Sequence, residues 1–152
     1  MLSRTHRRLT LLLLLAMIGI AIPGCSSFDR KWKAAAATAP PTDSIEGRWS
    51  GHWRSDVNDH NGKLRCIMTR LSPELYEARF HAKYAKILSF SYTARLNAQP
   101  GEGDQVVFQG ESDLGWYAGG VYQYDGWATP EKFFCTYKSK HDHGKFEMTR
   151  PE

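Results

Sequence analysis

The amino-acid sequence predicts an all-β domain over residues 44–152, built as a single antiparallel up-and-down β-barrel of about eight strands. Apolar and polar side chains alternate with a period of two, which is typical of strands with one buried face. Short turn sequences separate these segments, and no stretch of 44–152 keeps a helical period over three turns. A barrel is favoured over the alternative, a two-sheet β-sandwich, because closure removes the exposed edges of a long meander.

The strands are expected in eight consecutive segments. In residues 75–84, for example, Tyr76 and Phe80 share one face, whereas Glu77 and Arg79 share the opposite face. The same alternation predicts strands at 47–53, 63–70, 75–84, 87–96, 104–110, 115–125, 131–138 and 144–150.

The gaps between the predicted strands contain residues that favour turns, mainly Gly, Pro, Asn and Asp. These turns are expected at 58–62, 72–73, 100–103, 113–115, 125–126, 129–130 and 141–144. The sequence DHNGKL at 59–64 is echoed by DHGKF at 142–146, and Met-Thr-Arg follows soon after each. The first and last hairpins therefore share one design, and we expect them to be neighbours when the barrel closes.

The first 24 residues are predicted to be a signal peptide. Basic residues precede an apolar run of 14 residues at 9–22, a length typical of an export signal and too short to span a bilayer. The following sequence, Ile-Pro-Gly-Cys at 22–25, resembles the lipobox of bacterial lipoproteins. That resemblance implies cleavage after Gly24 and a diacylglycerol on the thiol of Cys25. An ordinary cleaved secretory signal and an uncleaved anchor are the alternatives.

Residues 25–43 are predicted to be the lipidated cysteine and a flexible linker, because their Ala/Thr/Pro composition has no periodic apolar face. The implied partner is a membrane, bound through acyl chains on Cys25. The expected location is the cell envelope, facing the periplasm or the exterior. Because Ser26 rather than Asp follows Cys25, the resemblance favours the outer membrane over the inner one. Nucleic acid is not an expected partner, since removing residues 1–24 lowers the net charge from +4 to +1.

The barrel domain resembles the lipocalin-like (calycin) barrels in two features. Gly47-Arg48-Trp49 opens the first predicted strand, and Arg150 ends the last one. The resemblance implies that Arg150 packs across Trp49 and closes the bottom of the barrel. It covers the architecture of residues 44–152, and no ligand-binding residue is carried over from it.

The predicted inward face is rich in aromatic residues, which indicates a cavity for a small apolar or amphipathic ligand. The expected lining consists of Trp49, Trp53, Tyr76, Phe80, Phe90, Tyr92, Trp116, Tyr122 and Tyr124. A solid core is the alternative, because eight strands enclose little space. The protein would then be a structural or adaptor lipoprotein that acts through its outer surface. The candidate contact residues for that role are Tyr117, Trp127, Val107, Val121 and Phe134.

Two cysteines remain once Cys25 is lipidated. Cys66 and Cys135 both fall on predicted inward faces, and three interpretations stay open: a disulfide bond, two buried thiols, or a metal or redox role. His60, His141 and His143 are weak candidates for metal ligands, but their spacing is that of tight turns.

No cofactor is expected. The sequence contains no catalytic motif, so binding is favoured over catalysis. An envelope hydrolase, the remaining alternative, would need a hydroxyl or carboxylate beside a histidine in a cleft.

Overall fold

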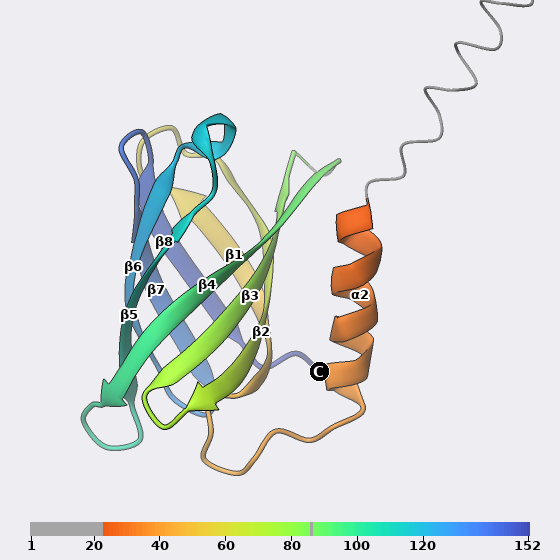
Figure 1. Cartoon of the computed structure of the whole chain (residues 1–152), viewed down its shortest axis with the longest axis vertical. Coiled ribbons are helices and arrows are strands. Elements are labelled where there is room, and N and C mark those ends of the chain that lie inside the picture. Colours follow the sequence, from red (N-terminus) through yellow and green to blue (C-terminus); the bar gives the residue numbers. More distant parts are fainter. Residues whose placement is uncertain (1–22, 86) are drawn as a thin grey trace, which may run out of the picture.

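The alternating segments form one closed antiparallel barrel, in which each strand is hydrogen-bonded to the next and the last is hydrogen-bonded to the first (Figure 1). The computed structural model describes residues 23–85 and 87–152. Its strands are β1 (Gly47–Ser55), β2 (Asn61–Ser72), β3 (Leu75–Tyr84), β4 (Leu88–Pro100), β5 (Val106–Asp113), β6 (Val121–Ala128), β7 (Lys132–Lys138) and β8 (His143–Thr149). The predicted up-and-down barrel is therefore confirmed in preference to the sandwich.

Seven of the predicted strands are confirmed, with ends that differ by a few residues. The strand predicted at 115–125 begins only at Val121, because residues 114–120 form a loop with the short 3-10 helix η1 (Trp116–Ala118). Gly115, Gly119 and Gly120 have φ angles of 81°, 96° and 77°. This left-handed region suits glycine and ends the extended conformation that a strand requires.

The first and last hairpins are neighbours, as the echo between their sequences predicted. β1 pairs with both β2 and β8, so that Gly51 lies opposite both Leu64 and Met148. A β-carbon on Gly51 would lie 2.0 Å from the carbonyl oxygen of Glu147. A glycine at this position therefore lets the two ends of the sheet approach closely enough to close the barrel.

Arg150 covers one end of the barrel, in the contact with Trp49 that the resemblance implied. The guanidinium carbon of Arg150 lies 3.9 Å from the ring centroid of the buried Trp49. The same guanidinium group donates hydrogen bonds to the backbone carbonyls of Ser44 and Glu46, both at 2.6 Å, and of Pro130 at 2.7 Å. One side chain thus joins the segment before β1, the turn between β6 and β7, and the end of β8.

The interior between this closed end and the middle of the barrel is packed solid. Aromatic rings contact one another throughout, including Phe80 with Phe133 and Phe133 with Phe108. The buried core also contains Trp49, Leu64, Cys66, Met68, Tyr76, Leu96, Tyr124, Cys135 and Met148. The solid core proposed as an alternative therefore describes this part of the barrel.

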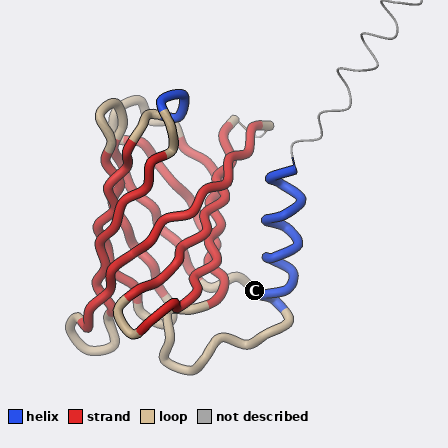
Figure 2. The backbone as a smooth tube through the Cα atoms, in the orientation of Figure 1, coloured by secondary structure: helices blue, strands red, loops and turns tan. Residues whose placement is uncertain are grey.

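A helix stands where the sequence predicted a flexible linker. The helix α2 (Pro23–Ala36) lies against the outer face of the barrel (Figures 1 and 2). Phe28 is only 1% exposed, with its ring stacked 4.7 Å from His81 of β3 and the Arg65 guanidinium of β2 lying 5.0 Å from its centroid. Arg65 also forms a 2.8 Å ion pair with Asp29. Trp32, one turn later, stacks on Phe28, so two aromatic residues four positions apart dock the helix.

The predicted signal peptide lies almost entirely outside the described residues, which begin at Pro23. In the described ranges 23–85 and 87–152, no helix combines the length and the apolar character needed to cross a bilayer.

We predict that Arg150→Met destabilises the barrel by roughly 2–4 kcal/mol, because several carbonyls lose their donor and Trp49 loses its stacked cation. The midpoint of urea unfolding measures this loss. Arg54→Met is the matched control, because the exposed Arg54 contributes only a surface ion pair with Asp59. A change at Arg150 within about 0.5 kcal/mol of the wild type would contradict the closing role.

We also predict that acid loosens α2. Burial lowers the pKa of His81 below its usual value of 6.5; Arg65 and Lys83 lower it further, and Asp29 opposes them. Docking is therefore strongest above about pH 6.5 and weakens as the pH falls through the lowered pKa of His81, because the undocked histidine binds the proton more readily.

Hydrogen-exchange protection factors of the α2 amides, corrected for intrinsic rates, measure this effect. The strand amides provide the internal reference. His81→Phe keeps a ring against Phe28 and should remove the pH dependence. Protection that falls equally in both proteins would assign the effect to another group.

Candidate functional site: a cavity at the open end of the barrel

An apolar cavity of about 330 Å³ lies at the end of the barrel opposite Arg150. The connections β1–β2, β3–β4, β5–β6 and β7–β8 surround this end, which is uppermost in Figure 1. The cavity is lined by Trp53, Ala82, Tyr84, Leu88, Ser89, Phe90, Tyr92, Leu114, Ala118, Tyr122, Tyr137, Asp142 and Phe146.

The walls of the cavity are held by contacts between aromatic rings. Tyr92 stacks between Phe90 and Phe80, with centroid distances of 5.6 and 5.2 Å. On the opposite side the rings of Tyr137 and Phe146 lie 5.0 Å apart. These contacts fix apolar surfaces before any ligand enters, which favours binding without reorganisation.

Trp53 is held at the rim of the cavity by a hydrogen bond. Its Nε1 atom donates to the carbonyl oxygen of Lys83 at 2.9 Å. Ala82, which precedes Lys83 on β3, also lines the cavity, and its cross-strand partner on β4 is Phe90. The cavity is open at this level partly because the side chain of alanine is smaller than those that fill the core nearer the closed end.

Polar groups enter the cavity from one side. The Tyr137 hydroxyl donates to the Asp142 carboxylate at 3.2 Å, and the Ser55 hydroxyl donates to the same carboxylate at 2.6 Å. Burial, aided by the Asp142 charge, raises the pKa of Tyr137. The hydroxyl therefore stays protonated across the physiological range.

A second pair of hydroxyls lies deeper. Burial raises the pKa of Tyr92 well above its usual value and that of Tyr124 to about 12. The Tyr124 hydroxyl lies 3.0 Å from the Ser112 hydroxyl. Of these residues only Tyr92 lines the cavity, which thus offers the neutral tyrosines Tyr92 and Tyr137 within an apolar lining. Such a lining suits a ligand with an apolar body and a polar group.

The nine predicted lining residues fall into three places. Trp53, Phe90, Tyr92 and Tyr122 line the cavity. Trp49, Tyr76, Phe80 and Tyr124 are buried in the solid core instead. The prediction for Trp116 needs correction, because its side chain is 92% exposed on η1, outside the barrel.

The predicted lining did not include nine other residues of the cavity, which are Ala82, Tyr84, Leu88, Ser89, Leu114, Ala118, Tyr137, Asp142 and Phe146. Tyr137 continues the inward series of Phe133 and Cys135 at a spacing of two, so the alternation along β7 contained its signal. Leu114 and Asp142 lie in loops, where a period of two gives no information.

Cys66 and Cys135 are buried free thiols, which is one of the three interpretations left open by the sequence. They belong to β2 and β7, strands that are not neighbours in the barrel. Burial, with a contribution from Cys135, raises the pKa of Cys66 well above its usual value. Burial likewise raises the pKa of Cys135 to about 12. Both groups are therefore poor nucleophiles in the folded protein.

We predict that neither Cys66 nor Cys135 reacts with a thiol reagent at pH 8 in the native protein, and that both react after unfolding without reductant. Counting labelled thiols by mass measures this. In a Cys25→Ser background, which removes the third cysteine of the chain, Cys135→Ser should lower the count in the unfolded protein from two to one. A count of zero in the unfolded Cys25→Ser protein would show a disulfide instead.

The histidines proposed as weak metal candidates lie near the open end in separate contacts. The ring of His60 lies 5.0 Å from that of Tyr84 and is tilted against it, with Nε2 3.3 Å from the Tyr84 hydroxyl. His141 lies in the β7–β8 turn, and His143 begins β8. Among the side chains that the structure describes, no three His, Cys, Asp or Glu residues are grouped closely enough to hold a metal ion.

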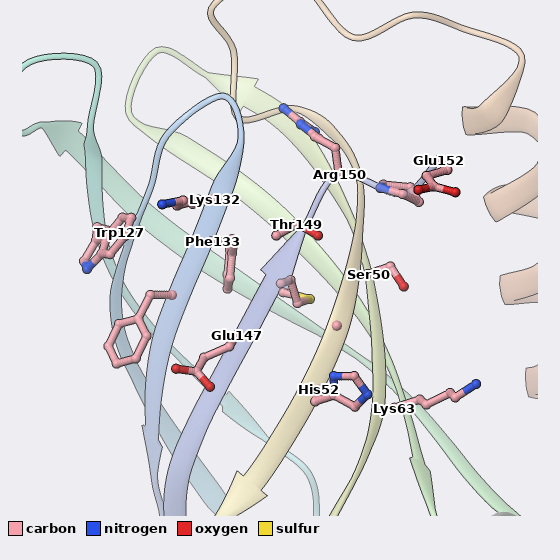
Figure 3. Close-up of a pocket in the computed structure, with 14 residues that line it drawn as sticks. Ser50, His52, Lys63, Trp127, Lys132, Phe133, Glu147, Thr149, Arg150 and Glu152 are labelled. Atoms are coloured by element: carbon pink, nitrogen blue, oxygen red, sulfur yellow. The ribbon is translucent and has the colours of Figure 1, made fainter.

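A larger groove of about 840 Å³ lies across the outside of β1, β7 and β8 (Figure 3). Its charged residues have both signs, with Lys63 and Lys132 beside Glu147 and Glu152. In Figure 3 these side chains spread over the surface rather than pointing to a common centre. The groove therefore lacks the converging polar groups that define a specific binding site.

The residues proposed for surface contact occupy two separate places. Val107, Trp127 and Phe134 are cross-strand neighbours on the outside of β5, β6 and β7, and the last two rings stack 6.0 Å apart. Tyr117 and Val121 instead lie beside the open end, in or next to the β5–β6 loop.

No protein-family model, curated protein or solved structure matches this chain. The geometry of the cavity therefore carries the functional argument.

Proposed function

We propose that this chain is a lipid-anchored cell-envelope protein whose barrel binds a small amphipathic or apolar ligand in the cavity at its open end. The observation that carries the proposal is that the two halves of the barrel interior are filled differently. The closed half is filled by packed side chains, whereas the open half leaves about 330 Å³ between aromatic walls. A cavity of that size is at the lower end of the range for small-molecule sites, roughly 300–1,000 Å³.

The sequence resemblances support the same proposal. The lipobox-like Ile-Pro-Gly-Cys at 22–25 favours attachment through Cys25, with the outer membrane as the preferred location. The Gly47-Arg48-Trp49 start and the Arg150 contact with Trp49 favour a lipocalin-like barrel. In such a protein the anchor sets the location, and the cavity supplies the activity.

The adaptor alternative has one observation in its favour. Trp127 and Phe134 form a stacked pair on the outer surface, beside the 39% exposed Val107. An aromatic patch of this kind suits contact with an envelope protein.

Ligand binding is tested by photo-crosslinking in cells that produce the full chain. A fatty acid carrying a diazirine group should become attached within the cavity, at peptides that contain Tyr92, Tyr122 or Tyr137. Unlabelled fatty acid should compete. Ala82→Trp should reduce this attachment several-fold, because an indole would occupy the space beside Phe90.

The matched control is Gln123→Trp, which places the same ring on the outside of β6, next to the inward Tyr122. This variant should label like the wild type. Labelling that is confined to the outer strands, or that ignores Ala82→Trp, would reject the cavity. Labelling lost only on changing Trp127 would favour the adaptor surface.

A further inference from the structure

The exposed apolar residues of the barrel gather around its open end. Ile87 of the β3–β4 turn is 84% exposed, and Trp116 of η1 is 92% exposed. The remaining members of this open rim are Val57, Leu88, Tyr117 and Val121. At the closed end the comparable residues are Leu71 and Val107, which lie on different strands. A large apolar rim around one opening marks a surface with a partner.

The predicted site of lipid attachment lies at the same end. α2 begins beside the open rim and runs toward the closed end, so the N-terminal end of the helix lies at the rim, whereas the chain enters β1 at the closed end (Figures 1 and 2). Cys25 belongs to the first turn of α2, three residues before the docked Phe28. Three helical residues span about 4.5 Å along the axis. The anchor is therefore held close to the barrel.

We propose that the open rim docks on the bilayer that holds Cys25, so that the cavity opens directly into the lipid. This inference rests on the proposed lipid anchorage and deepens the proposed binding function. It identifies the ligand source as the bilayer itself, because a lipid-like molecule could pass between membrane and cavity without crossing water.

The chemistry of the open rim fits a membrane surface. Trp and Tyr side chains favour the interface between water and hydrocarbon, and Trp116 and Tyr117 occupy adjacent positions at the tip of one loop. Among the described residues at this end, Lys83, Lys138 and Lys140 are accompanied by Asp56, Asp59, Asp113 and Asp142, so both signs of charge are present and neither forms a patch of its own. The contact is therefore apolar rather than dependent on anionic lipid.

Docking adds orientation to the acyl anchor. The diacylglycerol expected on Cys25 carries two acyl chains, which already hold a protein stably on a membrane, so the open rim orients the barrel rather than supplying the attachment. Because α2 is docked on the barrel, the open rim lies at the same level as the start of the helix, where the anchor is attached. The rim can therefore reach the bilayer without the entropic cost of ordering a long linker.

The test uses the full chain, purified with its lipid and reconstituted in phosphatidylethanolamine/phosphatidylglycerol vesicles. A cysteine introduced by Trp116→Cys carries an NBD fluorophore at the open rim. Glu102→Cys carries the same label in the β4–β5 turn at the closed end. The buried Cys66 and Cys135 should stay unlabelled, and the wild type provides the blank.

The label at position 116 should emit at shorter wavelength, and lipids carrying a doxyl group should quench it several-fold more than the label at position 102. Equal quenching at the two positions would overturn the proposal. A blue shift at 116 without doxyl quenching would also overturn it, because a second protein copy would then cover the open rim.

Phe28→Ala tests the role of α2. This variant keeps Cys25 but removes the docked ring, so quenching at position 116 should fall while the protein stays on the vesicles. Lys33→Ala changes an exposed residue of the same helix and should have no effect. Unchanged quenching in Phe28→Ala would overturn the role assigned to the helix.

Three readouts separate this inference from the proposed function. The mass of the purified protein reports acylation of Cys25. Ala82→Trp fills the cavity without changing the open rim, so it should reduce crosslinking several-fold and leave the quenching intact. If the wild type shows quenching at position 116 but no crosslinking, ligand binding is refuted and membrane docking stands. If the wild type shows crosslinking but no quenching, membrane docking is refuted and ligand binding stands.

Discussion

The contact of Arg150 with Trp49 is the constraint on which the rest of the molecule depends. A sheet of eight strands encloses a defined interior only when its first and last strands pair. β1 must therefore form backbone hydrogen bonds with both β2 and β8, as it does here. Arg150 secures that closure, because its guanidinium group binds carbonyls on both sides of the seam while covering the indole. The residues that close the barrel also fill one end of it, so the space for a ligand lies at the other end.

The size of inward side chains then decides where that space begins. Large rings such as those of Phe80 and Phe133 meet across the middle of the barrel. Above them, Ala82 and Ala118 leave room between Trp53 and Tyr122. The interior is therefore neither wholly solid nor wholly hollow, because packing density falls toward the open end. Burial keeps the tyrosine hydroxyls neutral, so they can bind a polar group without adding charge to an apolar site.

Much of the fold could be predicted from the period-two alternation. The position of each inward residue along the barrel axis, between the closed and the open end (its height), could not. Tyr76 and Tyr92 both point inward, yet Tyr76 is buried near the closed end because its partner is Leu96. Height depends on strand register, which is set by pairing between distant segments. Trp116 fitted the alternation in the sequence, but the glycines on both sides bend the chain out of the sheet. The Gly119-Gly120 pair was a turn signal that could have indicated this.

The α2 helix was missed for a related reason, because its apolar face consists of only two aromatic residues among alanines and charges. The complementary surface is also hidden in the sequence, since Arg65 and His81 occupy outward positions that normally face water. Only the folded barrel brings them together beneath Phe28. Because α2 is docked on these two residues, it cannot act as a flexible linker. A flexible chain of 18 residues would let the barrel move through roughly 25 Å, whereas a docked helix fixes its height and orientation. In the membrane-docked arrangement that we propose, exchange between bilayer and cavity depends on the geometry of the barrel rather than on the fluctuations of a linker.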